Sequence, residues 1–317
     1  MHARNRVLAC LVIAAVGWTL AGVLPARATT VPKNGPIVFY MDRGNGLEIF
    51  SISHTGRDLR QLTHEAGEWI ATAAQWSPDG RLIAFDIDDQ NGTCAIELMH
   101  PDGSGLLNLT KTHGGCDKDP SFTPNGRRIV FVRQPCLSCR EAIVSMNLKG
   151  GDRRRIIYTP RVHGRLLNPE DPNVSPDGAT LAFVGGLFDE ANVRALYTVK
   201  MDGTHLKRVV PFHFHVGTRI EWAPSGDRIV FTEYETGPGN TMTVRPDGSD
   251  LVAVTHYRGD VGAGGAVYSA DGRWIVFRLQ SDTLHSLWKM RPDGSDKTRL
   301  RRLPARFGGL DWGPRPT

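Results

Sequence analysis

Trp76-Ser-Pro-Asp-Gly80 is the stretch that decides the fold, because variants of it recur along the chain. Later copies begin at Phe122, Val174, Trp222 and Tyr268, and a degenerate copy, Trp312-Gly-Pro314, stands near the C-terminus. Successive copies begin 46, 52, 48, 46 and 44 residues apart. Repeats of this length are typical of propellers and solenoids.

The residue types in each repeat predict four short strands. Pro-Asp-Gly is turn chemistry, because Pro presets φ, Asp bonds to nearby backbone and Gly accepts positive φ. An apolar run follows each turn, for example Arg-Leu-Ile-Ala-Phe85, and such β-branched and aromatic runs predict strands. A third strand, a second turn such as Pro101-Asp-Gly103 and a fourth strand complete a unit of the size of a propeller blade.

The two ends of the chain complement each other. Residues 36–63 supply the second, third and fourth strands of a unit, whereas Gly308-Gly-Leu-Asp-Trp312 supplies only a first strand. We therefore expect an all-β fold: a six-bladed β-propeller of four-stranded antiparallel blades, closed by N- and C-terminal strands that share one blade. Such closure removes exposed sheet edges. A linear solenoid is the alternative, but it would not need a lone first strand at the far end.

The N-terminal segment has the parts of a secretory signal peptide. Arg4 and Arg6 precede an apolar stretch from Val7 to Leu24, and an Ala-x-Ala pattern ends at Ala28. We expect residues 1–28 to be a signal peptide and residues 29–317 to be a single propeller domain, exported to the periplasm or the extracellular space. An uncleaved membrane anchor is the alternative. After cleavage we expect no membrane span and a monomeric protein.

The small net charge of the chain argues against strong binding to a polyanion such as a nucleic acid. Removing residues 1–28 leaves 35 basic and 33 acidic residues, a net charge of +2. No basic stripe indicates DNA or RNA, so no nucleic-acid partner is expected. No phosphate-binding glycine motif follows a strand and opens a helix, and no cofactor is predicted.

Four cysteines remain after the leader. An even number in an exported protein predicts disulfides, with three possible connectivities. We favour pairing Cys94 with Cys116 and Cys136 with Cys139. A four-cysteine zinc site is the alternative, because a C-x-x-C spacing is present.

The connections between strands differ at the two ends of the units. Pro-Asp-Gly turns fall at one end, the turn end; the other, loop-bearing end carries longer connections at residues 161–172, 185–192 and 233–240. Binding sites tend to lie on irregular loops held by a rigid scaffold, so we expect binding at the loop-bearing end and at the mouth of a central channel. The histidines between units also fall at this end: His64, His113, His163, His213, His215 and His256.

Those histidines are candidate binding residues. Imidazoles that converge on a channel mouth could bind a transition metal or respond to pH. The alternative, which we favour, is that polar loops tolerate histidine and the rings lie too far apart to share an ion. Asp86, Asp88, Gln90 and Glu97 loosely imitate a calcium loop, but we interpret them as a solvated acidic loop.

The W-S-P-D-G-x-x-I-A-F pattern followed by P-D-G-S resembles the PD40 (WD40-like) repeat of TolB-type six-bladed propellers, over residues 36–317. The resemblance implies an exported propeller that binds other proteins, as TolB does in the Tol-Pal envelope system. We expect this chain to lack the α/β domain that precedes the TolB propeller. The predicted function is a non-catalytic scaffold whose partner is a protein, a peptide or an envelope glycan. The alternative is a metal-dependent lyase or hydrolase with a histidine-lined site, because some similar propellers are metal-dependent sugar lyases.

Overall fold

The structure is a computed structural model, and it describes residues 31–44, 46–64, 69–111, 114–136, 138–162, 164–187, 193–235 and 237–316. Two compact units divide the chain, Met1–Val31 and Pro32–Thr317. All the strands lie in the second unit. The expected signal peptide, residues 1–28, lies outside the described residues.

The strands follow the sequence repeats. The head of the chain supplies β1 (Asn34–Asp42), β2 (Leu47–Ile52) and β3 (Arg60–Gln61). The second unit has β4 (Ile70–Trp76), β5 (Ile83–Asp88), β6 (Cys94–Met99) and β7 (Leu107–Asn108). The third has β8 (Cys116–Phe122), β9 (Arg128–Gln134), β10 (Ala142–Asn147) and β11 (Arg154–Tyr158).

The second half repeats this plan. The fourth unit has β12 (Arg161–Val162), β13 (Arg165–Val174), β14 (Thr180–Leu187) and β15 (Arg194–Lys200), then β16 (Lys207–Val210) and the 3-10 turn η1 (Phe212–Phe214). The fifth has β17 (Glu221–Trp222), β18 (Ile229–Glu233), β19 (Asn240–Val244) and β20 (Val252–Ala253). The last strands are β21 (Gly262–Tyr268), β22 (Ile275–Gln280), β23 (His285–Met290), β24 (Thr298–Arg302) and β25 (Phe307–Pro314).

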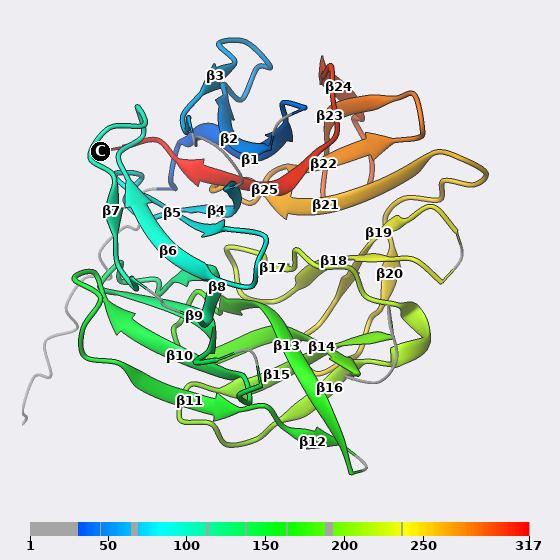
Figure 1. Ribbon diagram of the computed structural model, residues 1–317. Helices are drawn as coiled ribbons and strands as arrows, with labels where there is room; N and C mark the ends of the chain where they lie inside the picture. Colours follow the sequence, from blue (N-terminus) through cyan, green and yellow to red (C-terminus); the bar gives the residue numbers. More distant parts are fainter. Residues whose placement is uncertain are drawn as a thin grey trace, which may run out of the picture. The chain divides into compact units, whose positions relative to one another are not determined.

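The fold is all-β, with a propeller-like arrangement of antiparallel sheets (Figure 1). The first strand of each unit lies beside the first strand of the next, in the order β4, β8, β13, β17, β21, β25 and back to β4. We call these the inner strands. Because they neighbour one another in a closed order, their side chains surround a common centre.

The prediction of six separate four-stranded blades is wrong. The described residues form three four-stranded sheets, one five-stranded sheet and one eight-stranded sheet. The extra strand of the five-stranded sheet is β12, which pairs with β13. The eight-stranded sheet contains the strands of the second and third units, joined where β6 and β8 make a parallel bridge at Cys94 and Cys116.

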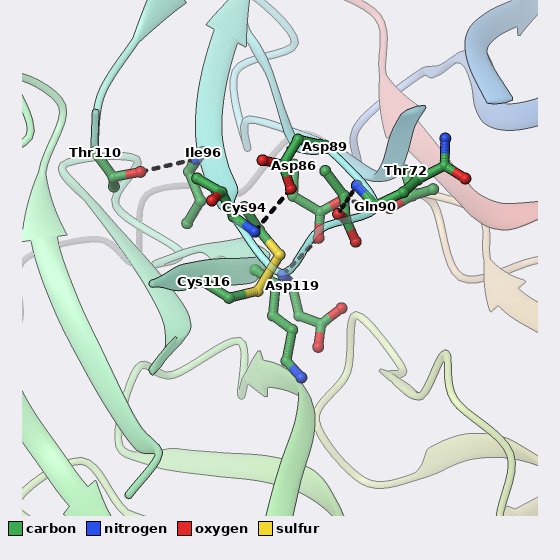
Figure 2. Close-up of a disulfide and its surroundings, with 12 residues drawn as sticks. Thr72, Asp86, Asp89, Gln90, Cys94, Ile96, Thr110, Cys116 and Asp119 are labelled. Atoms are coloured by element: carbon green, nitrogen blue, oxygen red, sulfur yellow. Dashed lines mark hydrogen bonds between the residues drawn. A yellow bond between two sulfur atoms is a disulfide. The ribbon is translucent and has the colours of Figure 1, made fainter. Parts of the chain in front are cut away.

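A disulfide explains this junction. Cys94 and Cys116 are bonded, with their Cα atoms 4.1 Å apart, so β6 and β8 approach closely enough for backbone pairing (Figure 2). Cys136 and Cys139 form the second disulfide. The favoured pairing is therefore confirmed. The alternative four-cysteine zinc site is not formed, because all four sulfur atoms are in disulfides.

The two ends of the chain share one sheet, as predicted. In Figure 1, β25 lies beside β1, and the two strands pair antiparallel with Ile37 opposite Trp312. The Trp312 indole nitrogen donates a hydrogen bond to the carbonyl oxygen of Gly35 at 3.1 Å. The Phe39 and Phe307 rings pack edge to face, with centroids 5.6 Å apart. This strand pair joins the beginning of the described unit to its end.

Apolar side chains of the second strands make the core between neighbouring sheets. Each unit places one phenylalanine of its second strand with no solvent exposure: Phe39, Phe85, Phe131, Phe183, Phe231 and Phe277. Burying a large apolar side chain contributes about 1.5–3 kcal/mol. The repeated Phe at the end of each Ile-Val-Phe run thus helps to pack its unit against the preceding unit.

Two expectations about connections need correction. Residues 161–172 were expected to form a long loop, but most of them belong to β12 and β13. Likewise, β14 extends to Leu187, into the loop expected at 185–192. The reason is that β13 and β14 continue their pairing beyond the usual hairpin, to Leu167 opposite Leu187. Among the described residues, no helix is long and apolar enough to cross a membrane.

Candidate functional site

A backbone distortion recurs three residues before the first residue of each motif. The residue there has positive φ in each unit: Ala73, Asp119, Asp171, Arg219, Gly265 and Gly309. In β4, β8, β13, β21 and β25 a register shift accompanies it. Such β-bulges bend a strand and redirect its side chains. Here they turn polar side chains of the inner strands toward the common centre.

A cavity of about 360 Å³ lies at these bulges, toward the loop-bearing end. We call it the bulge cavity. Side chains and backbone from every unit line it. Its polar lining consists of Tyr40, Thr72, Lys118, Asp119, Glu170, Asp171, Thr218, Arg219, Tyr234 and Arg278. A second cavity, of about 240 Å³, lies at the turn end and is lined by motif residues such as Trp76, Pro78, Phe122 and Ala270.

One buried arginine, Arg219, lines the bulge cavity and pairs with two buried carboxylates. Arg219 is 7% exposed, and its Nη2 lies 3.3 Å from Oδ1 of Asp311. Its Nη1 lies 3.9 Å from Oδ1 of Asp171, and the guanidinium also donates to the carbonyl oxygens of Ala74 and Leu310. Arg219 therefore ties three inner-strand segments, from different units, to one another.

Carboxylates near the inner strands accept hydrogen bonds from backbone amides of the next unit, and one of them, Asp119, lines the bulge cavity. The Asp119 amide donates to Asp86 Oδ2 at 3.0 Å, and the Asp171 amide donates to Asp119 Oδ2 at 3.3 Å. The Trp76 amide donates to Asp311 Oδ2 at 2.7 Å. Figure 2 shows Asp86 between Thr72 and the Asp119 amide, near the Cys94–Cys116 disulfide. These bonds satisfy the amides that the bulges leave without ladder partners.

The interpretation of Asp86 as part of a solvated loop is wrong. Asp86 is 5% exposed and also accepts a hydrogen bond from the Thr72 hydroxyl. The residue lies within β5 rather than in the turn that follows. Side chains alternate between the two faces of β5, and Asp86 lies on the face toward β8 of the next unit. Asp86 is therefore buried.

Burial changes the acidity of four carboxyl groups near the inner strands. Burial, followed by repulsion from the Asp119 carboxylate, raises the pKa of Asp86 to about 6. Burial raises the pKa of Asp171 to about 6, although the Arg219 guanidinium opposes the shift. Burial also raises the pKa of Asp311, and it raises that of Glu221 well above its usual range. Asp86 and Asp171 therefore change their charge near pH 6, and of the four groups Asp171 is the one that lines the bulge cavity.

Replacing Asp86 by asparagine should raise the free energy of unfolding at pH 7.5 by on the order of 2–3 kcal/mol and leave it unchanged at pH 4. The folded carboxyl group favours its neutral form, so its cost is absent below its ordinary pKa near 4. The cost is complete above about 6, and the stability of the unsubstituted protein falls as the pH rises between the two values. Urea unfolding at both pH values measures the difference.

Asp177→Asn is the control with the opposite sign. The Ser175 hydroxyl donates to Asp177, and this bond lowers the pKa of the Asp177 carboxyl. Its substitution should therefore reduce stability at pH 7.5. If Asp86→Asn changes the free energy of unfolding by the same amount at pH 4 and pH 7.5, the effect assigned to burial of Asp86 is contradicted.

The structure describes four of the six candidate histidines, His64, His213, His215 and His256; His113 and His163 lie outside the described residues. None of these four lines the bulge cavity. His256 lies at a separate pocket beside Phe214 and Tyr257. Across the described part of the chain, no group of three or more His, Cys, Asp or Glu side chains is placed to hold a metal ion. Histidine binding at the loop-bearing end stays a prediction.

Known proteins resemble this chain in sequence and in fold. No protein-family model matches the chain. A protein named TolB homolog from Chlorobium luteolum is 27% identical over 239 residues, which are 73% of this chain and 48% of that protein. The Tol-Pal system protein TolB of Gluconobacter oxydans is 34% identical over 146 residues, 32% of each chain. The present chain thus spans about half the length of the first relative and a third of the second.

The solved structures agree with the sequence relatives. The crystal structure of TolB from Acinetobacter baumannii superposes with a TM-score of 0.71 and 16% identity, over 89% of this chain and 67% of that chain. The chain is thus similar in sequence to proteins named TolB and has a TolB-like propeller fold.

Proposed function

We propose that this protein is an exported, non-catalytic binding scaffold that takes a peptide segment of a partner protein into the bulge cavity. The observation that carries the proposal is the cavity itself. It is polar, it is lined by every unit, and the bulges that form it recur at one position of the repeat. Ligand pockets typically have volumes of about 300–1,000 Å³, with a few polar groups that fix orientation.

Supporting features come from the scaffold and from the relatives. The chain is similar to proteins named TolB, one of them a Tol-Pal system protein. Two disulfides fit an oxidising compartment, which agrees with export by the segment at residues 1–28. We further propose that the repeats are of the PD40 type and that the protein works as a monomer.

Peptide display tests the function when it is combined with substitutions that place a bulky side chain in one cavity or the other. Random dodecapeptides are selected on the immobilised protein, and the affinities of enriched peptides are measured by fluorescence polarisation. Thr218 is exposed and lines the bulge cavity, so Thr218→Trp should weaken peptide binding at least tenfold. Ala270 lines the cavity at the turn end, and Ala270→Trp should leave the affinity unchanged.

Two results would contradict the proposal. One is the reverse pattern, in which only Ala270→Trp weakens binding. The other is a selection that enriches no peptide with an affinity sensitive to Thr218→Trp.

A further inference from the structure

Arg278 is the cation of the bulge cavity that has no acidic partner among the described residues. Lys118 lies 3.3 Å from Glu141, and Arg219 lies between Asp171 and Asp311. Arg278 instead donates from Nη1 to the carbonyl oxygen of Phe307 at 2.6 Å. Its Nε is buried without a hydrogen-bond partner, and Nη2 donates to none of the residues that the structure describes. One proton of Nη1 and both protons of Nη2 are therefore left for a ligand.

Two glycines lie against this guanidinium and let two tyrosine hydroxyls approach the same backbone. A methyl group on Gly308 would lie 3.1 Å from Nη1 of Arg278 and 2.5 Å from the Tyr40 hydroxyl oxygen. A methyl group on Gly264 would lie 3.3 Å from Nη2 and 3.2 Å from the Tyr234 hydroxyl oxygen. The Tyr40 hydroxyl and Nη1 thus lie near Gly308, and the Tyr234 hydroxyl and Nη2 lie near Gly264. All four groups can donate hydrogen bonds to an acceptor that enters the bulge cavity beside them.

The charges on the opposite wall of the cavity determine how a charged ligand would be oriented. Asp119, Glu170 and Asp171 come from the third and fourth units, whereas Arg278 and Tyr40 come from the last unit and the head of the chain. A ligand carboxylate would be repelled from the acidic wall and attracted to Arg278. Arginine forms paired, charge-assisted hydrogen bonds with carboxylates, which are stronger than neutral ones.

From this geometry we propose that Arg278, with Tyr40 and Tyr234, forms a subsite for a carboxylate group of the bound peptide. The subsite rests on the proposed function, because it assigns the chemistry of the segment that the bulge cavity takes. The carboxylate has two possible sources, the C-terminus of the peptide and an Asp or Glu side chain.

Matched peptides separate these sources. Each fluorescein-labelled peptide from the display selection is made in three forms: with a free C-terminal carboxylate and every acidic side chain amidated, with a C-terminal amide and its acidic side chains retained, and with every carboxylate amidated. A peptide without an acidic residue receives one Glu. One of the first two forms should bind at least tenfold more tightly than the third, and that form identifies the source.

Substitutions then connect the carboxylate to Arg278. Arg278→Gln should weaken binding of the preferred form about tenfold or more and leave binding of the fully amidated form within twofold. Gly264→Ala should act in the same direction while keeping the arginine, because the added methyl group occupies the space beside Nη2. Gly264 does not have positive φ, so alanine fits its backbone conformation. This variant therefore keeps the test decisive if Arg278→Gln fails to fold. Arg302→Gln, on the exposed strand β24, is the matched control and should change neither affinity.

The outcomes distinguish the two proposals. Peptides that bind, respond to Thr218→Trp and show equal affinity in all three forms would overturn the carboxylate subsite but not the binding function. An Arg278→Gln effect of equal size on the carboxylate and amide forms would also overturn it. Absence of Thr218-sensitive binding overturns the function itself.

Discussion

Replacing Arg219 by methionine should lower the free energy of unfolding at pH 7.5 by about 3–5 kcal/mol. Removing one partner from a buried ion pair leaves the other charge uncompensated, and this loss has that size. Here the uncompensated groups are Asp171 and Asp311, which are 8% and 5% exposed. The substitution also removes donors from the carbonyl oxygens of Ala74 and Leu310.

Urea unfolding provides the measurement, and Arg228→Met provides the control. Arg228 pairs with Asp250, but both side chains are partly exposed, so that loss should stay within about 1 kcal/mol. The Arg219→Met loss should shrink at pH 5, because burial raises the pKa of Asp171 to about 6 and raises that of Asp311 as well. Equal losses for the two arginines would contradict the role assigned to Arg219.

A chain that ends at Arg306 should lose cooperative folding. It lacks β25 and therefore three buried side chains, Phe307, Leu310 and Trp312. Each such loss costs about 2–5 kcal/mol, and the whole domain is stabilised by about 5–15 kcal/mol. The truncation also removes Asp311 and exposes the edge of β1 to other chains.

Thermal unfolding followed by tryptophan fluorescence measures this effect. A chain that ends at Arg315 retains all of β25 and should unfold at nearly the temperature of the full chain. A sharp unfolding transition in the Arg306 truncation would show that the head and tail strands do not hold the propeller together.

The sequence predicts the elements that depend on local chemistry. Pro-Asp-Gly turns and Ile-Val-Phe runs give the hairpins, because φ preferences and β-branched side chains act within a few residues. The shared sheet of β1 and β25 also follows, since a lone first strand at Gly308–Trp312 needs a partner. The pairing of Cys94 with Cys116 adds a backbone bridge that spacing alone does not specify.

The bulge cavity was not predicted. Its signal in the sequence is the residue three positions before the first residue of each motif. Asp119 and Asp171, like glycine, are of a type that tolerates positive φ, but Ala73 and Arg219 are not, so no single residue type marks the position. At Ala73 and Arg219 the surrounding structure rather than local preference holds the positive φ. Glycine occupies the position only at Gly265 and Gly309. The buried state of Asp86 likewise depends on a neighbouring unit.

The histidines show the limit of reasoning from loop position. His213 and His215 flank Phe214 next to β16, and His64 and His256 follow other fourth strands. Their common place in the repeat puts them at one end of the fold, but side-chain direction decides whether rings meet. Sequence spacing carries no information on that direction in irregular segments.

Hydrogen exchange with a display-selected peptide tests the central claim most directly, because it reports which backbone segments the ligand covers. Peptide binding should slow exchange in the segments around Thr72, Lys118, Tyr234, Gly265 and Gly308, which line the bulge cavity. Protection confined to the Pro-Asp-Gly turns of the opposite end, or to the outer strands β7, β11 and β20, would contradict the assignment of the binding site.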